Sequence, residues 1–180
     1  MFTDNFNDGD AAGWALSPSG YWSVVGGQLT TVGGTTGAWA WESATRSLPS
    51  EETSFEARMA TSATTASNQG IVAATADQLY QVLFIVDQGN TLRWSTTIAG
   101  VWSGWTAAGT TDRTAFHTYT IRRMGSTFSV LLDETVMASG IAAGPPTAWM
   151  NGIAQGVLFT QAEIAGQMLG TRFDDVVAWK

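Results

Sequence analysis

The sequence predicts an all-β domain built from two packed antiparallel sheets. The chain has 20 glycines and is rich in threonine, serine, valine and aromatic residues, whereas only 13% of its residues are charged. Almost no stretch repeats apolar residues at helical spacing. Short runs of β-forming residues recur instead at the spacing of about 8 to 12 residues that is typical of sandwiches and barrels. With 180 residues, 44% of them hydrophobic, the chain suits one domain over residues 1–180.

About a dozen strands are expected, because each run combines β-branched or aromatic residues with flanking turn residues. In order they are 21–27, 28–33, 38–43, 54–61, 69–75, 80–87, 91–97, 117–124, 127–133, 135–140, 156–161 and 172–179.

The clearest local signal is a three-strand meander over 117–140. Phe128, Val130 and Leu132 repeat with a period of two, and Gly125-Ser126 and Asp133-Glu134 supply the turns. In contrast, the apolar run 82–86 is continuous, which indicates a central strand covered on both faces, or covered on one face and lining a groove on the other. Two prolines and two glycines make 141–152 a long connection with room for one helical turn.

Charge and composition exclude several function classes. The net charge is −7 and no basic cluster is long enough to follow a phosphate backbone, so nucleic acid is not an expected partner. The absence of cysteine excludes disulfides and thiolate metal sites, and a single histidine argues against zinc. The first ten residues do not resemble a secretory signal, and no apolar run is long enough for membrane insertion. We expect an extracellular or virion-surface location reached without a signal in this chain.

Four segments together resemble the concanavalin A-like lectin/glucanase superfamily, and in particular its laminarin-G-type and carbohydrate-binding members. They are "DNFNDGDAAGW", "YWSVVGGQL", "FHTYTIRRMGSTFSVLLDETVMASG" and "GVLFTQ…RFDDVVAW", in this order over nearly the whole chain. The resemblance implies a jelly-roll sandwich in which one sheet is curved and its concave face carries the sugar site.

The same resemblance implies a structural calcium ion that joins the two chain ends. Carried onto this sequence, its ligands are the carbonyls of Asn5 and Gly27 and the carboxylate of Asp174, a set of oxygen donors that suits Ca²⁺. The alternative is that Asp174 is hydrogen-bonded to the N-terminal loop while Asp175 faces water, since neighbours on a strand point to opposite faces. Asp4, Asp8 and Asp10 are spaced like a calcium loop, but they do not complete the EF-hand pattern.

Catalytic residues are not evident. The superfamily's glucanases carry E-x-D-x-x-E on one strand, whereas the acids near strands here, Glu42, Glu56 and Glu163, each stand alone. A glycoside hydrolase needs two acids about 5 to 9.5 Å apart, so the sequence predicts a protein that is not an enzyme, with a pair assembled from different strands as the remaining route. The single histidine, His117, lies at a strand start and is expected to be structural.

Nine tryptophans in 180 residues are the strongest functional signal, because indole rings stack on the C–H faces of neutral sugars. Trp14, Trp22 and Trp179 are expected in the core. The candidate ligand-binding residues are Trp39, Trp41, Trp94, Trp102 and Trp105, with Gln81, Asn90 and Arg93 as polar companions. The competing interpretation is that these tryptophans also fill the core.

These observations lead to two alternative candidate functions. The first is a non-catalytic glycan-binding or adhesion module for a polysaccharide or cell-surface glycan. The second is a structural virion component, such as a phage decoration, fibre or tail protein, that uses the fold to contact other virion proteins or copies of itself. A groove with two coplanar exposed indoles would favour the sugar, and a flat apolar patch would favour assembly.

Overall fold

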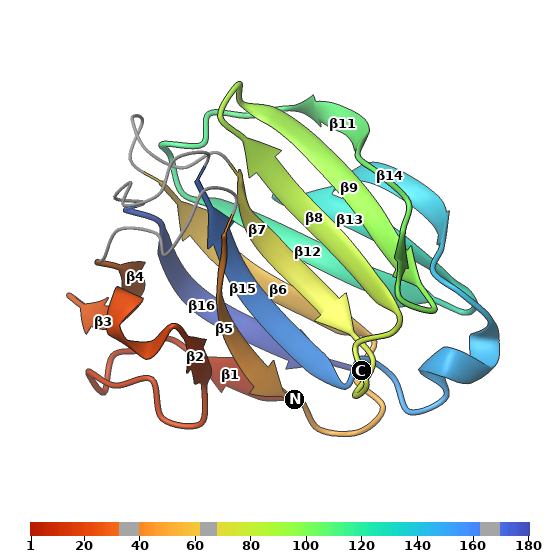
Figure 1. Cartoon of the computed structure of the whole chain (residues 1–180), viewed down its shortest axis with the longest axis horizontal. Helices are drawn as coiled ribbons and strands as arrows, with labels where there is room; N and C mark the ends of the chain where they lie inside the picture. Colours follow the sequence, from red (N-terminus) through yellow and green to blue (C-terminus); the bar gives the residue numbers. More distant parts are fainter. Residues whose placement is uncertain (33–39, 62–67, 163–169) are drawn as a thin grey trace.

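The computed structural model describes residues 1–32, 40–61, 68–162 and 170–180, and within them it confirms a sandwich of two antiparallel sheets (Figure 1). Sheet A contains, in spatial order, β14 (Thr135–Ala142), β13 (Thr127–Leu132), β12 (His117–Met124), β6 (Ser54–Ala60), β16 (Arg172–Trp179), β4 (Gln28–Thr31) and β3 (Trp22–Val25), with β1 (Phe2–Asp4) paired to β16. Sheet B contains β10 (Val101–Trp102), β9 (Thr91–Ile98), β8 (Gln81–Asp87), β7 (Asn68–Ala74), β15 (Gln155–Gln161), β5 (Trp41–Ser47) and β2 (Ala15–Ser17), with β11 (Thr106–Thr110) paired to β9.

Each of the twelve expected strands overlaps a strand of the described residues, while residues 33, 38 and 39 of the expected ranges lie outside them. The four described strands that the sequence did not predict, β1, β2, β10 and β11, have two to five residues each. The meander is confirmed as β12, β13 and β14. The connection after β14 does contain one helical turn, the 3₁₀ helix η2 (Pro146–Trp149). A second short 3₁₀ helix, η1 (Ser19–Tyr21), precedes β3, and neither helix is long enough to cross a membrane.

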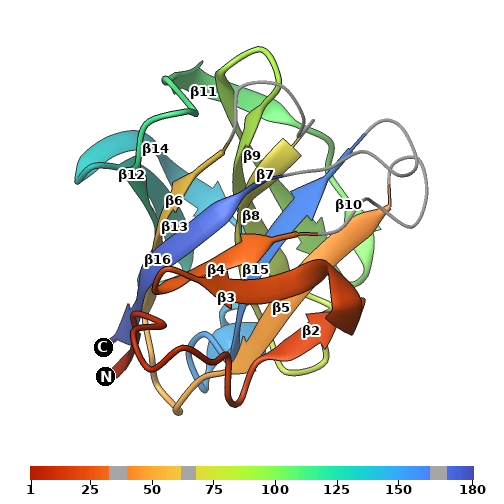
Figure 2. The ribbon, with the colours of Figure 1, turned by 90° about the vertical axis from the view of Figure 1, so that its left-hand side faces the viewer.

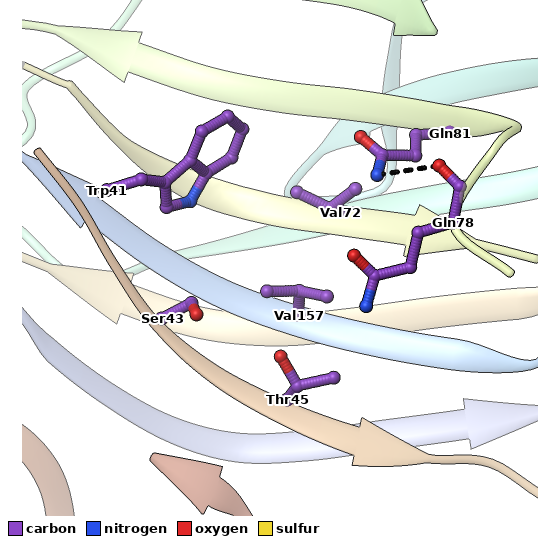
Figure 3. Close-up of a pocket in the computed structure, with 7 residues that line it drawn as sticks. All are labelled: Trp41, Ser43, Thr45, Val72, Gln78, Gln81 and Val157. Atoms are coloured by element: carbon purple, nitrogen blue, oxygen red, sulfur yellow. Dashed lines mark hydrogen bonds between the residues drawn. The ribbon is translucent and has the colours of Figure 1, made fainter. Parts of the chain in front are cut away.

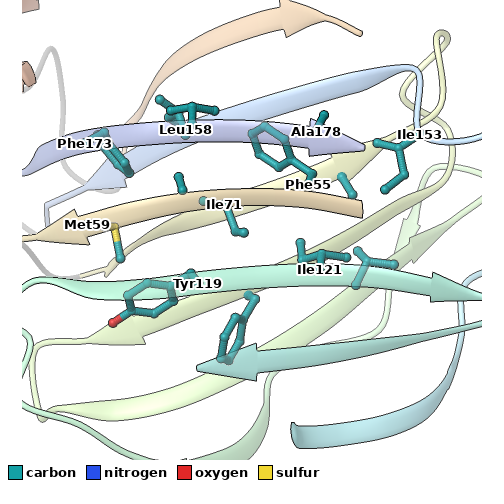
Figure 4. Packing of buried hydrophobic residues seen from close by; sticks show 14 of the residues in the cluster. Phe55, Met59, Ile71, Tyr119, Ile121, Ile153, Leu158, Phe173 and Ala178 are labelled. Carbon is teal, nitrogen blue, oxygen red and sulfur yellow. The ribbon is translucent and has the colours of Figure 1, made fainter. Parts of the chain in front are cut away.

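The hydrophobic core lies between the sheets (Figure 4). Alternate residues of each strand point into it, so Phe55, Tyr119 and Phe173 of sheet A meet Ile71 and Leu158 of sheet B. Trp14 and Trp22 belong to this core, as expected. Trp149 of η2 also lies in it, where its ring packs edge to face on Phe128 and its indole N–H donates to the carbonyl of Ala143 at 2.9 Å.

Trp179 differs from the expectation. The core residues of β16 are Phe173, Val176 and Ala178, so Trp179 alternates with the core and is only half-buried. The two chain ends do meet, because β1 pairs with β16 with Phe2 opposite Ala178 (Figure 2). Sheet A therefore joins the two chain ends, and the outer face of sheet B takes no part in joining them.

Candidate functional site: an aromatic groove on sheet B

Sheet B is apolar on both faces. Its inner residues belong to the core, while Val72, Leu83, Ile85, Val157 and Phe159 form a second buried cluster on its outer face, against which Trp105 packs. The continuous apolar run 82–86 has its explanation here. Val82, Phe84 and Val86 face the core, whereas Leu83 and Ile85 form part of the outer cluster.

Three adjoining cavities open on this outer face, and together we call them the groove. The first has a volume of about 410 Å³ and is lined by Trp41, Asn68, Gln81, Leu83, Thr97, Trp102, Trp105, Phe159 and Gln161. The second cavity, of about 250 Å³, shares Trp41 and Gln81 with the first. Val72 and Val157 also line this second cavity (Figure 3). The third, of about 530 Å³, shares Ser43, Thr45 and Gln78 with the second and continues to Gly13 and Arg46.

Trp41 stands where the first two cavities meet. It begins β5, and its side chain is 46% exposed although its ring lies 4.6 Å from that of Phe159, measured between centroids. Trp41 therefore combines a fixed position on the groove floor with an indole surface that a ligand can reach.

Trp102 and Trp105 form the opposite side of the first cavity. Trp102 is 55% exposed, Trp105 is half-buried on the outer cluster, and their ring centroids lie 5.8 Å apart with the planes at 75°. The two rings meet edge to face, so they do not form the coplanar pair that we considered diagnostic for a sugar site. We call this pair the two-indole wall.

The polar side chains around the groove are mostly amides. Asn68 donates to Gln161 at 2.9 Å at one end of the strands, and Gln78 donates to Gln155 at 2.8 Å at the other. Gln81 donates to the backbone carbonyl of Gln78 at 3.1 Å (Figure 3). These neutral donors and acceptors suit sugar hydroxyl groups.

The described lining of the groove has no carboxylate. No acidic residue is among the described residues that line its three cavities, and Arg46 is the one charged residue there. On the outer face of β5, β7, β8, β9 and β15, alternation leaves one carboxylate, Asp87 at the end of β8.

Asp87 is engaged in an ion pair. Arg93 Nε donates to its Oδ2 at 2.7 Å, and the backbone N–H groups of Gly89 and Thr91 donate to Oδ1. Burial alone would raise the pKa of Asp87, but the hydrogen bonds from Arg93, Thr91 and Gly89 hold it below its ordinary value. Asp87 is thus an ionised structural acid that fixes the turn between β8 and β9.

The structure brings together three of the five predicted tryptophans. Trp41, Trp102 and Trp105 share one cavity, and Trp39 lies outside the described residues. The expectation for Trp94 was wrong, because Trp94 is on the same face of β9 as the core residue Leu92 and packs against the core. The polar face of Arg93, Ser95 and Thr97 was the signal that pointed to this orientation.

Of the predicted polar companions, Gln81 lines the groove, Arg93 pairs with Asp87, and Asn90 lies exposed in the turn after β8. Sequence reasoning missed Asn68, Gln78, Phe159 and Gln161. The period-two alternation of β15 groups Phe159 and Gln161 on one face, but it does not say that this face is a groove.

The two acids near the C-terminus do not point to opposite faces, and this expectation is corrected. The pairing of β16 with β6 shifts between Asp174 and Val177, and Asp175 has a φ of 46°. This β-bulge interrupts the alternation, so Arg58 Nη1 lies 3.9 Å from Asp174 Oδ2 and 3.7 Å from Asp175 Oδ2. Gln28 also donates weakly to Asp174, at 3.5 Å.

The three calcium ligands that the resemblance implied, Asn5, Gly27 and Asp174, each have their own neighbours in the structure. Asn5 lines a cavity with Asp175, Asp4 and Asp8, whereas Asp174 faces Arg58 and Gln28, and Gly27 lies against Asn7. No group of three or more acids or histidines in the described ranges is placed to hold a metal ion. Calcium binding at the chain ends therefore rests on the resemblance alone.

The other acids of the N-terminal loop have structural roles. Asp4 accepts from the indole N–H of Trp14 at 2.8 Å and from the backbone N–H of Phe6, and Asp8 and Asp10 each accept from the backbone N–H two residues later. These bonds are Asx turns, which explains the calcium-like spacing without an ion.

Two of the remaining candidate acids, Glu42 and Glu56, and the histidine are away from the groove. Glu42 is fully buried on the inner face of β5, Glu56 accepts from Thr120 at 2.7 Å in sheet A, and Glu163 lies outside the described residues. His117 Nδ1 lies 2.6 Å from Asp133 Oδ2, where it links the start of β12 to the turn after β13.

Comparisons with known proteins support the fold. No protein-family model matches the chain, and no curated protein sequence does. Among solved structures, the chain is similar to the β-glucanase of Bacillus licheniformis, with a TM-score of 0.75 at 10% identity over 99% of this chain and 97% of that one. It is also similar to SCLam, a non-specific endo-β-1,3(4)-glucanase from family GH16, with a TM-score of 0.72 at 12% identity over 100% and 90%.

A third similar structure is the carbohydrate binding module CBM66 from Bacillus subtilis, with a TM-score of 0.63 at 12% identity over 93% of this chain and 96% of that one. Enzymes and a binding module therefore share this architecture at identities that define the fold alone. The chain has the concanavalin A-like lectin/glucanase jelly-roll fold.

Proposed function

We propose that this chain is a non-catalytic glycan-binding module that holds a neutral polysaccharide in the groove on sheet B. The observation that carries the proposal is the convergence of Trp41, Trp102 and Trp105 on one cavity of about 410 Å³. Exposed indoles offer a sugar ring an apolar surface, and the cavity has the size range of sites for small organic ligands.

The polar lining supports a neutral ligand. Amide and hydroxyl side chains such as Asn68, Gln161 and Thr97 donate and accept hydrogen bonds without charge. A sulfated or uronic acid polymer would need basic partners, and the first two cavities have no basic residue among the described ones that line them.

The floor of the groove argues against hydrolysis. The outer cluster beneath the groove is apolar and consists of Val72, Leu83, Ile85, Val157 and Phe159, and the described lining supplies no pair of carboxylates for a glycosidic bond. Asp87, the acid on this face of the described strands, is already paired with Arg93. The similar structures include both glucanases and a carbohydrate binding module, so the fold permits either role, and the lining of the groove favours binding.

The test is isothermal titration calorimetry with a panel of neutral polysaccharides, including β-1,3-1,4-glucan, together with a reducing-end assay on the same mixtures. We expect saturable binding to at least one polysaccharide and no new reducing ends. The variant Trp102→Ala should bind more weakly, whereas Trp94→Phe, which alters the core side of the same sheet, should keep the wild-type affinity. The alternative role as a virion component stays a prediction from the sequence.

A further inference from the structure

The two-indole wall stands on an irregular stretch of sheet B. Trp102 pairs with Thr97 of β9, and Thr106 pairs with Trp94. Between these pairs, the three residues 103–105 oppose the two β9 residues Ser95 and Thr96. One extra residue on one strand is a β-bulge, a device that commonly redirects side chains next to functional sites.

Inside this bulge, two hydrogen bonds of Ser103 take the place of the regular backbone pairing between the strands. Its backbone N–H donates to the carbonyl of Thr96 at 2.9 Å, and its Oγ accepts from the backbone N–H of Thr96 at 3.0 Å. In a regular antiparallel pair, the second bond would go to the backbone carbonyl of the facing residue. The Ser103 hydroxyl takes the place of that carbonyl and leaves the chain free to turn at Gly104, which has a φ of 84°.

Other contacts hold the hydroxyl in place. Ser103 Oγ also lies 3.2 Å from Thr96 Oγ1 and 3.3 Å from Ser95 Oγ, and both of these β9 residues are buried. The bulge is thereby fixed to a buried part of β9. Trp102 directly precedes the bulge and Trp105 is its last residue, so the backbone of the bulge connects the two rings that meet edge to face.

We propose that Ser103 is the positioning residue of the glycan site: its hydroxyl replaces a backbone acceptor in the bulge and so holds Trp102 and Trp105 in the orientation that a ligand meets. This inference rests on the proposed function for its effect on affinity. The positioning itself is independent of any ligand.

The first experiment compares variants by calorimetry with a neutral polysaccharide that the wild type binds. Ser103→Ala should weaken binding about fivefold, the effect expected from one net hydrogen bond. Ser103→Thr keeps the hydroxyl and should stay within about twofold of the wild type. Ser129→Ala, which removes a buried serine from β13 in the opposite sheet, serves as the control for a general loss of stability. Equal affinity of Ser103→Ala and wild type, or equal weakening by Ser103→Ala and Ser103→Thr, would overturn the proposal.

The second experiment needs no ligand. With 5-fluorotryptophan incorporated, ¹⁹F NMR reports each indole separately, and single Trp→Phe variants assign the signals. In Ser103→Ala we expect the signals of Trp102 and Trp105 to shift or broaden, while those of the core residues Trp14, Trp22 and Trp149 stay in place. An unchanged spectrum contradicts the positioning role. If the wild type binds no neutral glycan, the proposed function fails, and the NMR result still decides the role of Ser103.

Discussion

The indole rings of Trp102 and Trp105 meet edge to face on the outer face of sheet B, with centroids 5.8 Å apart and planes at 75°. Such contacts contribute about 0.5 to 1.5 kcal/mol beyond the area they bury, so each ring restrains the other. Trp102 stays 55% exposed in this pair, which makes it the side chain of the wall that is most available to a ligand.

Removal of Trp102 should therefore weaken glycan binding much more than it lowers the stability of the fold. We expect Trp102→Ala to lower glycan affinity about 30-fold, or about 2 kcal/mol, as for other tryptophan hot spots. Its free energy of unfolding, measured with urea, should fall by no more than about 0.5 to 1.5 kcal/mol, the contribution of the ring contact, because more than half of the side chain is exposed. Trp94→Phe is the matched control, with an expected loss of stability and unchanged affinity. Weaker binding by Trp94→Phe than by Trp102→Ala would show that the groove has been assigned to the wrong face.

The ion pair of Asp87 and Arg93 predicts that the free energy of unfolding falls at low pH. We call this fall the acid limb. The pKa of Asp87 is lowered in the folded protein, against about 3.9 in an unfolded chain. A lowered folded pKa contributes stability that is complete above the unfolded value and is lost as the pH falls through the folded value. The pKa of Asp133 is lowered too, since hydrogen bonds from Thr118 and His117 outweigh the opposing effect of burial.

We therefore expect the free energy of unfolding, measured with urea, to hold steady between about pH 5 and 7 and to fall below about pH 4. Asp87→Asn should cost about 1 to 3 kcal/mol at pH 7, since charged hydrogen bonds are lost from a mostly buried group, and should flatten the acid limb. An acid limb of the same steepness in Asp87→Asn would show that other groups cause it.

A glycine on the inner face of β15 tests the packing between the sheets. A Cβ on Gly156 would lie 2.2 Å from Cε2 of the fully buried Phe55. We expect Gly156→Ala to destabilise the fold by about 1 to 3 kcal/mol through overpacking. Gly20→Ala, at an exposed glycine with open space for a Cβ, should stay within about 0.5 kcal/mol of the wild type in the same thermal unfolding assay. Similar costs for both variants would contradict the packing between Gly156 and Phe55.

The chain ends give a prediction about calcium. Because Arg58 already lies beside Asp174 and Asp175, we expect equal melting temperatures in calcium and in a chelator. Arg58→Ala should lower the melting temperature in both conditions by leaving two neighbouring carboxylates without their cation. A rise of several degrees with calcium would instead support the ion that the resemblance implied.

The sequence predicted the sheets better than it predicted the site, for a physical reason. A period of two assigns side chains to alternating faces, and it located twelve of the sixteen described strands and grouped Phe128, Val130 and Leu132 correctly. Alternation alone does not state which face meets the core. On β9 the polar face of Arg93, Ser95 and Thr97 indicates it, and the prediction for Trp94 did not use that face. Where an extra residue interrupts the pairing of two strands, alternation itself fails, as at Asp175 and over residues 103–105.

The groove itself is a property of tertiary structure. Trp41, Leu83, Trp102 and Phe159 come from four strands, and their meeting depends on the strand order β10-β9-β8-β7-β15-β5. The abundance of tryptophan led to the prediction of a ligand surface, and three of the tryptophans named for it line the groove. The amides that complete the lining had no pattern of their own.

The most direct measurement is a calorimetric titration of the wild-type chain with neutral polysaccharides, run beside a reducing-end assay. The proposed function predicts saturable binding with no release of reducing ends, and loss of that binding in the double variant Trp102→Ala, Trp105→Ala. Absence of binding to every neutral polysaccharide, or steady production of new reducing ends, would contradict it.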